Sequence, residues 1–182
     1  MASSDRVRRS KFLAYLLRHQ PEALDLDMDR AGWVRVNALL RGLQARDASW
    51  TRERLEQIVR QSKKNRFAFD AAGTRIRARY GHSVAVDLGY DPAVPPDVLF
   101  HGTPEASVDA ICSEGLRPMN RQHVHLSEEV AAARTVARRR GHPVVLRIDA
   151  REMHADSFRF YRTESGVWLV DRVPPEYLQT GS

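Results

Sequence analysis

The chain has 182 residues, of which 42% are hydrophobic and 29% charged, a composition that supports a folded core and excludes wholesale disorder. Its net charge of +6 favours an anionic partner such as nucleic acid, although a codon bias could account for most of its arginines. The apolar runs are far shorter than the roughly 18 residues of a membrane span. No charged and apolar leader opens the sequence, so a cytoplasmic protein without membrane association is expected.

Three helices and a hairpin are expected in the first half of the chain. Apolar residues at helical spacing predict the helices at residues 11–22, 35–43 and 51–64, with Pro21 stopping the first and Asn37 capping the second. Residues 66–83 alternate on both sides of the turn "DAAGT", which is typical of a β-hairpin. Helices followed by a hairpin indicate a winged-helix-like lobe, an architecture common in nucleic-acid binding.

The stretch "DLGYDPAVPPD" interrupts regular structure with three prolines and predicts a boundary between domains at 1–90 and 91–182. Strands and helices then alternate. Strands are expected at 97–103, 123–127, 143–149, 158–163 and 166–170, and helices at 107–115 and 128–141. Ser127 is expected to cap the second of these helices, and Gly141 to follow its end. This pattern predicts a compact α+β domain, and α+β as the fold class of the whole chain.

The sequence lacks a glycine-rich nucleotide loop, a zinc-type Cys/His spacing and a Ser-His-Asp order, and no metal is expected. Cys112, at helical spacing with Val108 and Ile111, is expected in the core. Basic and polar residues instead gather where elements end. They are Arg18, His19, Arg66, Arg77, Gly81, His82, Ser83, His101, Gly102, Thr103, Arg121, His125 and Ser127. Because clefts between domains are preferred ligand sites, they are expected to line a seam between the two halves.

Six blocks in series carry a family resemblance: "FLAYLLRHQPE", "SKKNRFAF", "IRARYGHS", "LFHGT", "RQHVHLS" and "SGVWL". In this order they resemble the RNA 2′-phosphotransferases, NAD-dependent enzymes that remove the splice-junction 2′-phosphate from tRNA. The resemblance implies an N-terminal winged-helix lobe for RNA and a C-terminal ADP-ribosyltransferase-like lobe for NAD. It also implies that the RNA 2′-phosphate displaces nicotinamide from NAD. The ribose 2″-hydroxyl then attacks that phosphate, giving RNA with a 2′-hydroxyl and ADP-ribose 1″,2″-cyclic phosphate.

The resemblance assigns residues as well. Arg18, His19, Arg66 and Arg121 correspond to the family's catalytic set, in which the arginines grip the phosphate and His19 either donates to it or shuttles a proton. His101, Gly102 and Thr103 match the NAD-binding block, with Gly102 letting the backbone approach the dinucleotide. Further cofactor-binding candidates are Arg77, Gly81, His82, Ser83, His125, Leu126 and Ser127. The chain departs from the family pattern at Ser165, where Asn is expected, and at Arg79, where a neutral residue is expected.

Two other functions fit the same residues. The protein could ADP-ribosylate terminal phosphates of RNA or DNA and stop there, or it could be a nucleic-acid-binding regulator that senses NAD. The expected partners of the leading function are RNA with an internal 2′-phosphate, tRNA among the candidates, and NAD as co-substrate. A monomer is expected.

Overall fold

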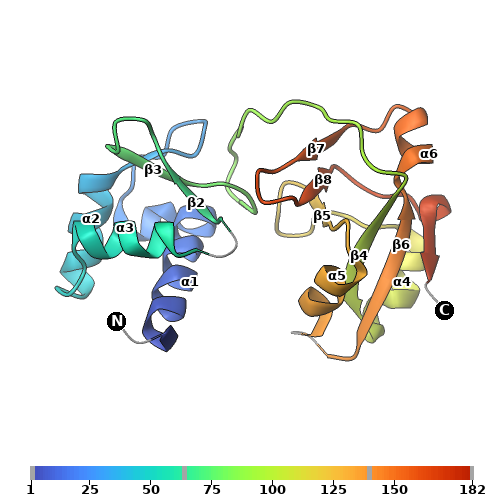
Figure 1. Ribbon diagram of the computed structural model, residues 1–182, viewed down its shortest axis with the longest axis horizontal. Helices are drawn as coiled ribbons and strands as arrows, with labels where there is room; N and C mark the ends of the chain where they lie inside the picture. The colour runs from blue at the N-terminus through green and yellow to red at the C-terminus, as the bar shows by residue number, and fades with distance from the viewer. Residues whose placement is uncertain (1–2, 63–64, 139–140, 181–182) are drawn as a thin grey trace. The chain divides into compact units, whose positions relative to one another are not determined.

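The computed structural model describes residues 3–62, 65–138 and 141–180. The chain divides into two compact units, Met1–Gly89 and Tyr90–Ser182, and each has a hydrophobic core of its own (Figure 1). Helices and antiparallel sheets occur in both units, which confirms the α+β class. Along the described residues, no helix combines the length and apolar character needed to cross a membrane.

The three helices of the first unit confirm the predicted ones with shifted ends. They are α1 (Ser3–His19), α2 (Val36–Arg46) and α3 (Arg52–Arg60). Pro21 does end α1, and it opens a single 3₁₀ turn at Pro21–Leu24. Asn37 was wrongly predicted as the cap of α2, because the short strand before the helix already brings Arg35 into that position. The predicted last turn of the third helix, at Lys63 and Lys64, lies outside the described residues.

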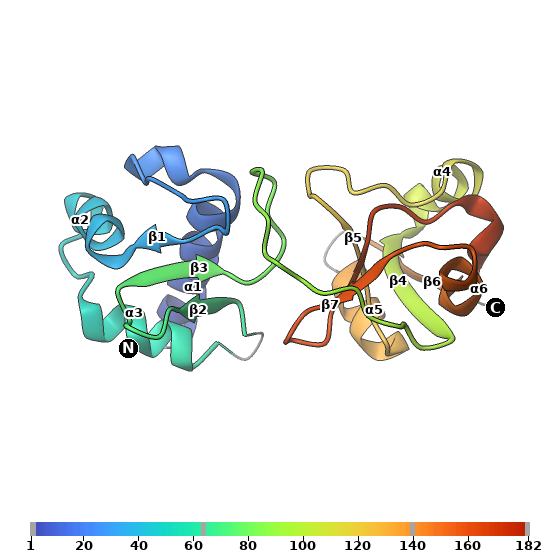
Figure 2. The ribbon, with the colours of Figure 1, turned by 90° about the horizontal axis from the view of Figure 1, so that it is seen from above.

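The sheet of the first unit contains the predicted hairpin. Its strands are β1 (Val34–Arg35), β2 (Phe67–Phe69) and β3 (Arg75–Ala78), in the antiparallel order β1-β3-β2. Figure 2 shows α1 running behind this sheet, where its buried leucines pack with Ile76 of β3. The two residues of β1 are too few to carry an alternating pattern, so the sequence did not indicate this strand.

Two three-stranded antiparallel sheets form the second unit. One consists of β4 (Val98–Pro104), β6 (Pro143–Asp149) and β9 (Leu178–Thr180) in the order β4-β6-β9. The other consists of β5 (Val124–Leu126), β8 (Trp168–Val170) and β7 (Phe160–Arg162) in the order β5-β8-β7. Paired backbone hydrogen bonds between Phe100 and Ser127, of 2.8 and 2.9 Å, link β4 to the end of β5. All five predicted strands are confirmed, and β9 is an addition.

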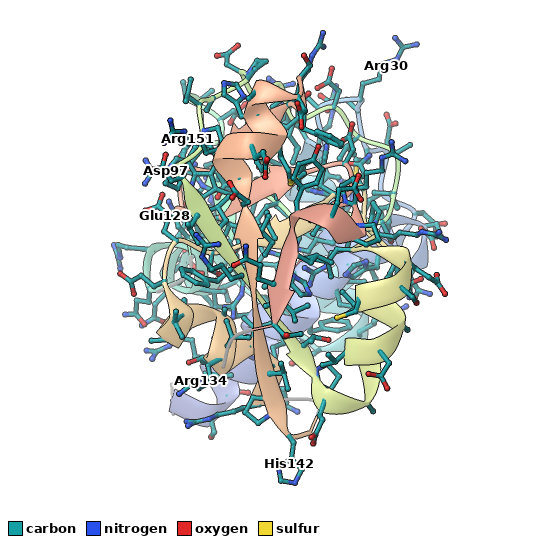
Figure 3. All side chains as sticks on the ribbon, turned by 90° about the vertical axis from the view of Figure 1, so that its right-hand side faces the viewer. Arg30, Asp97, Glu128, Arg134, His142 and Arg151 are labelled. Atoms are coloured by element: carbon teal, nitrogen blue, oxygen red, sulfur yellow. The ribbon has the colours of Figure 1, made fainter. Side chains whose placement is uncertain are left out.

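The helices of the second unit are α4 (Val108–Glu114), α5 (Val130–Ala137) and α6 (Ala150–Ala155), with 3₁₀ turns at Glu105–Ser107 and Pro175–Tyr177. Helix α5 packs on β4 and β6. Helix α6 was not predicted. Asp149 is its N-cap, and the Asp149 carboxylate accepts a hydrogen bond from the Glu152 amide. Arg151 of this helix lies 3.9 Å from the carboxylate of Asp97, and Figure 3 labels both residues.

Three predictions for these helices are wrong. Ser127 does not cap α5, because it stays extended to pair with Phe100, and Glu129 takes the cap position. Helix α5 ends at Ala137 with Arg138 as its C-cap, so Gly141 does not directly follow the helix end as predicted. The predicted helical residues Arg139 and Arg140 lie outside the described residues. Cys112 is exposed, because the two-turn helix α4 packs only through the side that carries Ile111.

Candidate functional site

The predicted site residues fall into two groups, one in each unit. Those of the first unit are Arg18, His19, Arg66, Arg77, Gly81, His82 and Ser83, and those of the second are His101, Gly102, Thr103, Arg121, His125, Leu126 and Ser127. Among the described residues, no three His, Cys, Asp or Glu side chains come close enough together to bind a metal ion.

The segment after β3 folds back onto the last turn of α1. The amide of Ser83 donates to the Arg18 carbonyl over 2.9 Å, which satisfies one of the carbonyls that a helix leaves without a partner at its end. The Ser83 hydroxyl lies 3.4 Å from the same carbonyl and 3.0 Å from Nδ1 of His19. Since that hydroxyl donates to the carbonyl, it accepts from His19 Nδ1–H. The structure therefore brings Arg18, His19 and Ser83 together, and Ser83 orients the imidazole.

The Arg18 side chain lies against two further residues of this segment. Its guanidinium carbon is 4.7 Å from the centroid of the Tyr80 ring, within the range of a cation–π contact. Gly81 has a φ of 83°, and a Cβ added there would lie 3.5 Å from Arg18 Nη1. That distance is an ordinary van der Waals contact, so the positive φ favours glycine at this position, and the guanidinium lies against the backbone there. The sequence did not indicate Tyr80, because a lone tyrosine after a strand is an ordinary surface residue.

The other two predicted arginines of this unit, Arg66 and Arg77, make their hydrogen bonds away from the end of α1. Arg66 Nη1 donates to Ser10 Oγ over 3.3 Å, and Ser10 lies eight residues, roughly 12 Å, before Arg18 along the axis of α1. Arg77 donates to the Ala31 carbonyl over 3.1 Å, and its guanidinium carbon lies 4.6 Å from the Trp33 ring centroid. Through these contacts Arg77 holds the loop before β1 against β3. The alternating pattern of the strand did not indicate these partners.

His82, between Gly81 and Ser83 in the same segment, is buried, with only 2% of its surface exposed. Neither ring nitrogen has a hydrogen-bond partner among the residues that the structure describes. Burial, reinforced by the charges of Arg18, His19 and Arg77, lowers the pKa of His82 from 6.5 to about 4. His82 is therefore neutral at physiological pH, and its side chain packs inside the first unit.

This burial predicts a loss of stability in mild acid. The unfolded chain binds a proton at His82 below about pH 6.5, whereas the folded chain does so only below about pH 4. The free energy of unfolding of the first unit should therefore be fully present above pH 6.5 and fall by about 3 kcal/mol as the pH drops to 4. Urea unfolding at several pH values measures this fall in the free energy of unfolding. The substitution His82→Asn should remove the part of the pH dependence that comes from His82. A His82 ring that titrates near 6.5 by NMR would contradict the prediction.

In the second unit, two histidines and an arginine join β4 to β5. His101 Nδ1 donates to the His125 carbonyl over 3.1 Å, so Nε2 is the acceptor nitrogen of the neutral His101 ring. Arg121 Nη1 donates to His125 Nδ1 across the turn before β5. The structure thus brings His101, His125 and Arg121 together, with Ser127 one residue past the end of β5 and paired to β4.

The remaining residues of the predicted NAD-binding block have structural positions. A Cβ on Gly102 would lie 1.9 Å from the backbone oxygen of Ala133, so the close approach at this glycine is made by helix α5. Thr103 is 3% exposed and Leu126 only 1%, and Leu126 belongs to the core of this unit. Gly102 therefore packs against α5, and the side chains of Thr103 and Leu126 are buried.

Glu128, one residue after Ser127, is a polar residue that the sequence did not single out. Its Oε1 accepts from Trp168 Nε1 over 2.7 Å and from Arg162 Nε over 3.2 Å, which anchors the end of β5 to β7 and β8 (Figure 3 labels Glu128). The partners come from distant parts of the chain, so no local pattern could have indicated them.

The family model described as "RNA 2'-phosphotransferase, Tpt1 / KptA family" matches residues 4–172. A relative from Nostoc punctiforme is 50% identical over 179 residues, which cover 98% of this chain and 99% of the relative. One from Streptomyces coelicolor is 48% identical, covering 95% and 94%, and one from Pseudomonas aeruginosa is 48% identical, covering 93% and 94%. All three carry the name "Probable RNA 2'-phosphotransferase". With its helix-end arginine and histidine, and with the match running through both units, the chain belongs to the RNA 2′-phosphotransferase family.

Proposed function

We propose that this protein removes an internal 2′-phosphate from RNA and transfers it to NAD. The products are RNA with a 2′-hydroxyl, nicotinamide and ADP-ribose 1″,2″-cyclic phosphate. In the overall balance, the phosphate oxygen replaces nicotinamide at the anomeric carbon. The proton of the ribose 2″-hydroxyl ends on the RNA 2′-oxygen when that hydroxyl closes the cyclic phosphate. Family membership supports the RNA 2′-phosphate as substrate, and the resemblance of the six sequence blocks implies NAD as co-substrate.

The observation that carries the proposal is the end of α1. Arg18 and His19 are neighbours there, and the segment from Tyr80 to Ser83 fixes both. A guanidinium recognises phosphate oxygens through two parallel N–H donors, and an imidazole both donates and exchanges protons near neutral pH. In our proposal Arg18 binds the 2′-phosphate, while Ser83 keeps His19 oriented toward the same group, as its partner in binding or proton transfer.

Arg66 and Arg121 complete the proposed set. Both steps move negative charge through one phosphate group, so fixed cations that surround it lower the barrier. In the structure, Arg66 Nη1 donates to Ser10 Oγ over 3.3 Å. In our proposal Arg66 exchanges this neutral acceptor for the charged phosphate, an exchange that costs little free energy. Arg121 belongs to the second unit, where its guanidinium donates to His125.

The donor set of the second unit fits NAD. Arg121 offers a cation for a pyrophosphate or phosphate, His101 an acceptor nitrogen for a ribose hydroxyl, and Ser127 a further hydroxyl. When bound, NAD supplies the ribose carbon that receives the phosphate. The residues of this chain would bind and orient it, and Gly102 also lets α5 pack closely on β4.

We further propose that the first unit is a winged-helix RNA lobe and the second an ADP-ribosyltransferase-like NAD lobe. The order helix, strand, helix, helix and hairpin, with β1 paired to β3, supports the first assignment. Two small antiparallel sheets joined at Phe100 and Ser127 support the second.

A single reaction tests the proposed function. Purified protein is mixed with a short RNA that bears one internal 2′-phosphate, with and without NAD, and the products are resolved by mass. We expect NAD-dependent loss of the phosphate and one ADP-ribose 1″,2″-cyclic phosphate per phosphate removed. RNA that accumulates a stable ADP-ribosyl group would instead indicate an ADP-ribosyltransferase, and unchanged RNA with intact NAD would indicate a binding protein.

A further inference from the structure

Tyr80 lies outside every group assigned so far, and yet it contacts the arginine on which the proposed reaction depends. The face of its ring lies 4.7 Å from the Arg18 guanidinium carbon. The residue follows β3 and precedes Gly81, the glycine against which the same guanidinium lies. Tyr80 and Gly81 therefore border the Arg18 side chain from one continuous segment.

This segment is itself fixed. Ser83 donates to the Arg18 carbonyl, Arg79 donates through its amide to the Arg66 carbonyl over 2.8 Å, and His82 is buried. Tyr80 lies between these anchors and is half-buried, so its ring is held in place more firmly than a loop tyrosine on the open surface. A ring held in this way is a platform on which a guanidinium can rest.

An arginine gains from such a platform. Its side chain has about 2 kcal/mol of rotamer entropy to lose when it grips a ligand. A guanidinium stacked on an aromatic face has already lost part of that freedom, while its N–H groups stay in its own plane and remain usable as donors to a phosphate. Preorganised charge of this kind stabilises a developing anion without reorganisation at the moment of reaction.

We infer that Tyr80 is a positioning residue for Arg18: the face of its ring holds the guanidinium in the orientation that grips the RNA phosphate. The inference rests on the proposed function, since it takes Arg18 as a phosphate ligand. The ring face supplies the effect and the hydroxyl does not, so phenylalanine should substitute for tyrosine while an aliphatic side chain should not.

The test compares Tyr80→Phe with Tyr80→Leu in the full chain, with NAD and the 2′-phosphorylated RNA as substrates. Tyr80→Phe should retain wild-type kcat. Tyr80→Leu should lower kcat about tenfold, the size expected when a partly desolvated cation–π contact is lost, with little change in the KM for NAD. The matched control is Phe69→Leu, which removes the ring beneath Arg52, another arginine–aromatic stack of this unit at 5.3 Å, and should leave kcat unchanged.

Two results of this kinetic comparison would overturn the inference. Full turnover in Tyr80→Leu would mean that Arg18 needs no platform, and an equal loss in Tyr80→Phe would assign the effect to the hydroxyl. If Tyr80→Leu lowers the melting temperature, a double-mutant cycle on binding of the 2′-phosphorylated RNA decides. Tyr80→Leu should then weaken binding in the wild-type background and have no further effect in Arg18→Ala. Equal effects in both backgrounds contradict a role through Arg18.

Failure of this inference is distinguishable from failure of the proposed function. An Arg18→Ala protein with full activity would remove the phosphate-binding role itself. An inactive Arg18→Ala protein beside a fully active Tyr80→Leu protein would leave the proposed function intact and remove only the platform.

Discussion

Replacement of Arg18 by alanine should lower the turnover of 2′-phosphorylated RNA by roughly 100-fold or more while the protein stays folded. Losses of this size follow when one preorganised donor to a developing oxyanion is removed. The helix should tolerate the change, because Arg18 is in the last turn of α1 and alanine is a good helix former. Steady-state kinetics with NAD at saturation measure the effect, and far-ultraviolet circular dichroism checks the fold.

The matched control for Arg18→Ala is Arg52→Ala. Arg52 is also an arginine of the first unit stacked on an aromatic ring, that of Phe69, and it donates to the Gly73 carbonyl. It belongs to no proposed site, so its loss should leave turnover unchanged. Arg18→Lys adds a finer test, since lysine keeps the charge but not the planar fork and should recover only part of the activity. An Arg18→Ala enzyme as active as the Arg52→Ala enzyme contradicts the phosphate-binding role.

A Gly102→Ala substitution should destabilise the second unit by about 3 kcal/mol or more, as severe overpacking does. The added methyl would lie 1.9 Å from the backbone oxygen of Ala133 and 2.6 Å from its carbonyl carbon. Backbone atoms cannot turn away as a flexible side chain can, so α5 would have to separate from β4. Chemical unfolding of the full chain, followed by a probe in the second unit such as Trp168, measures the loss.

The control for Gly102→Ala is Gly89→Ala. Gly89 has a φ of 66° and nothing within 4 Å of an added Cβ. The same methyl there meets only backbone strain and should cost about 1–2 kcal/mol. Normal stability of Gly102→Ala with weakened use of NAD would show that this glycine serves a close approach of the dinucleotide, as the family resemblance implied, and that the packing of α5 tolerates the change.

The sequence by itself determined most of the regular elements, because periodicity and breakers are local. The apolar stripe of α1, the stop at Pro21 and the alternation of Phe67 and Phe69 required no knowledge of distant contacts. The same holds for the position of Arg18 and His19, which are adjacent in the sequence and fall in the last turn of α1. Errors occurred where tertiary contacts override local preference. Ser127 is a good helix cap by type, but its backbone pairs with Phe100, and Cys112 has helical spacing on a helix too short to bury it.

The surroundings of the candidate site residues were decided only by the tertiary structure. His82, Gly81 and Ser83 are consecutive polar or small residues and look alike in the sequence. Folding buries the first, lays Arg18 along the second and bonds the third to His19. The close packing of α5 on Gly102 likewise has no signal in the local sequence. Burial and close approach depend on segments far apart in the chain, such as α1 with residues 80–83, and no local pattern encodes which of them will meet.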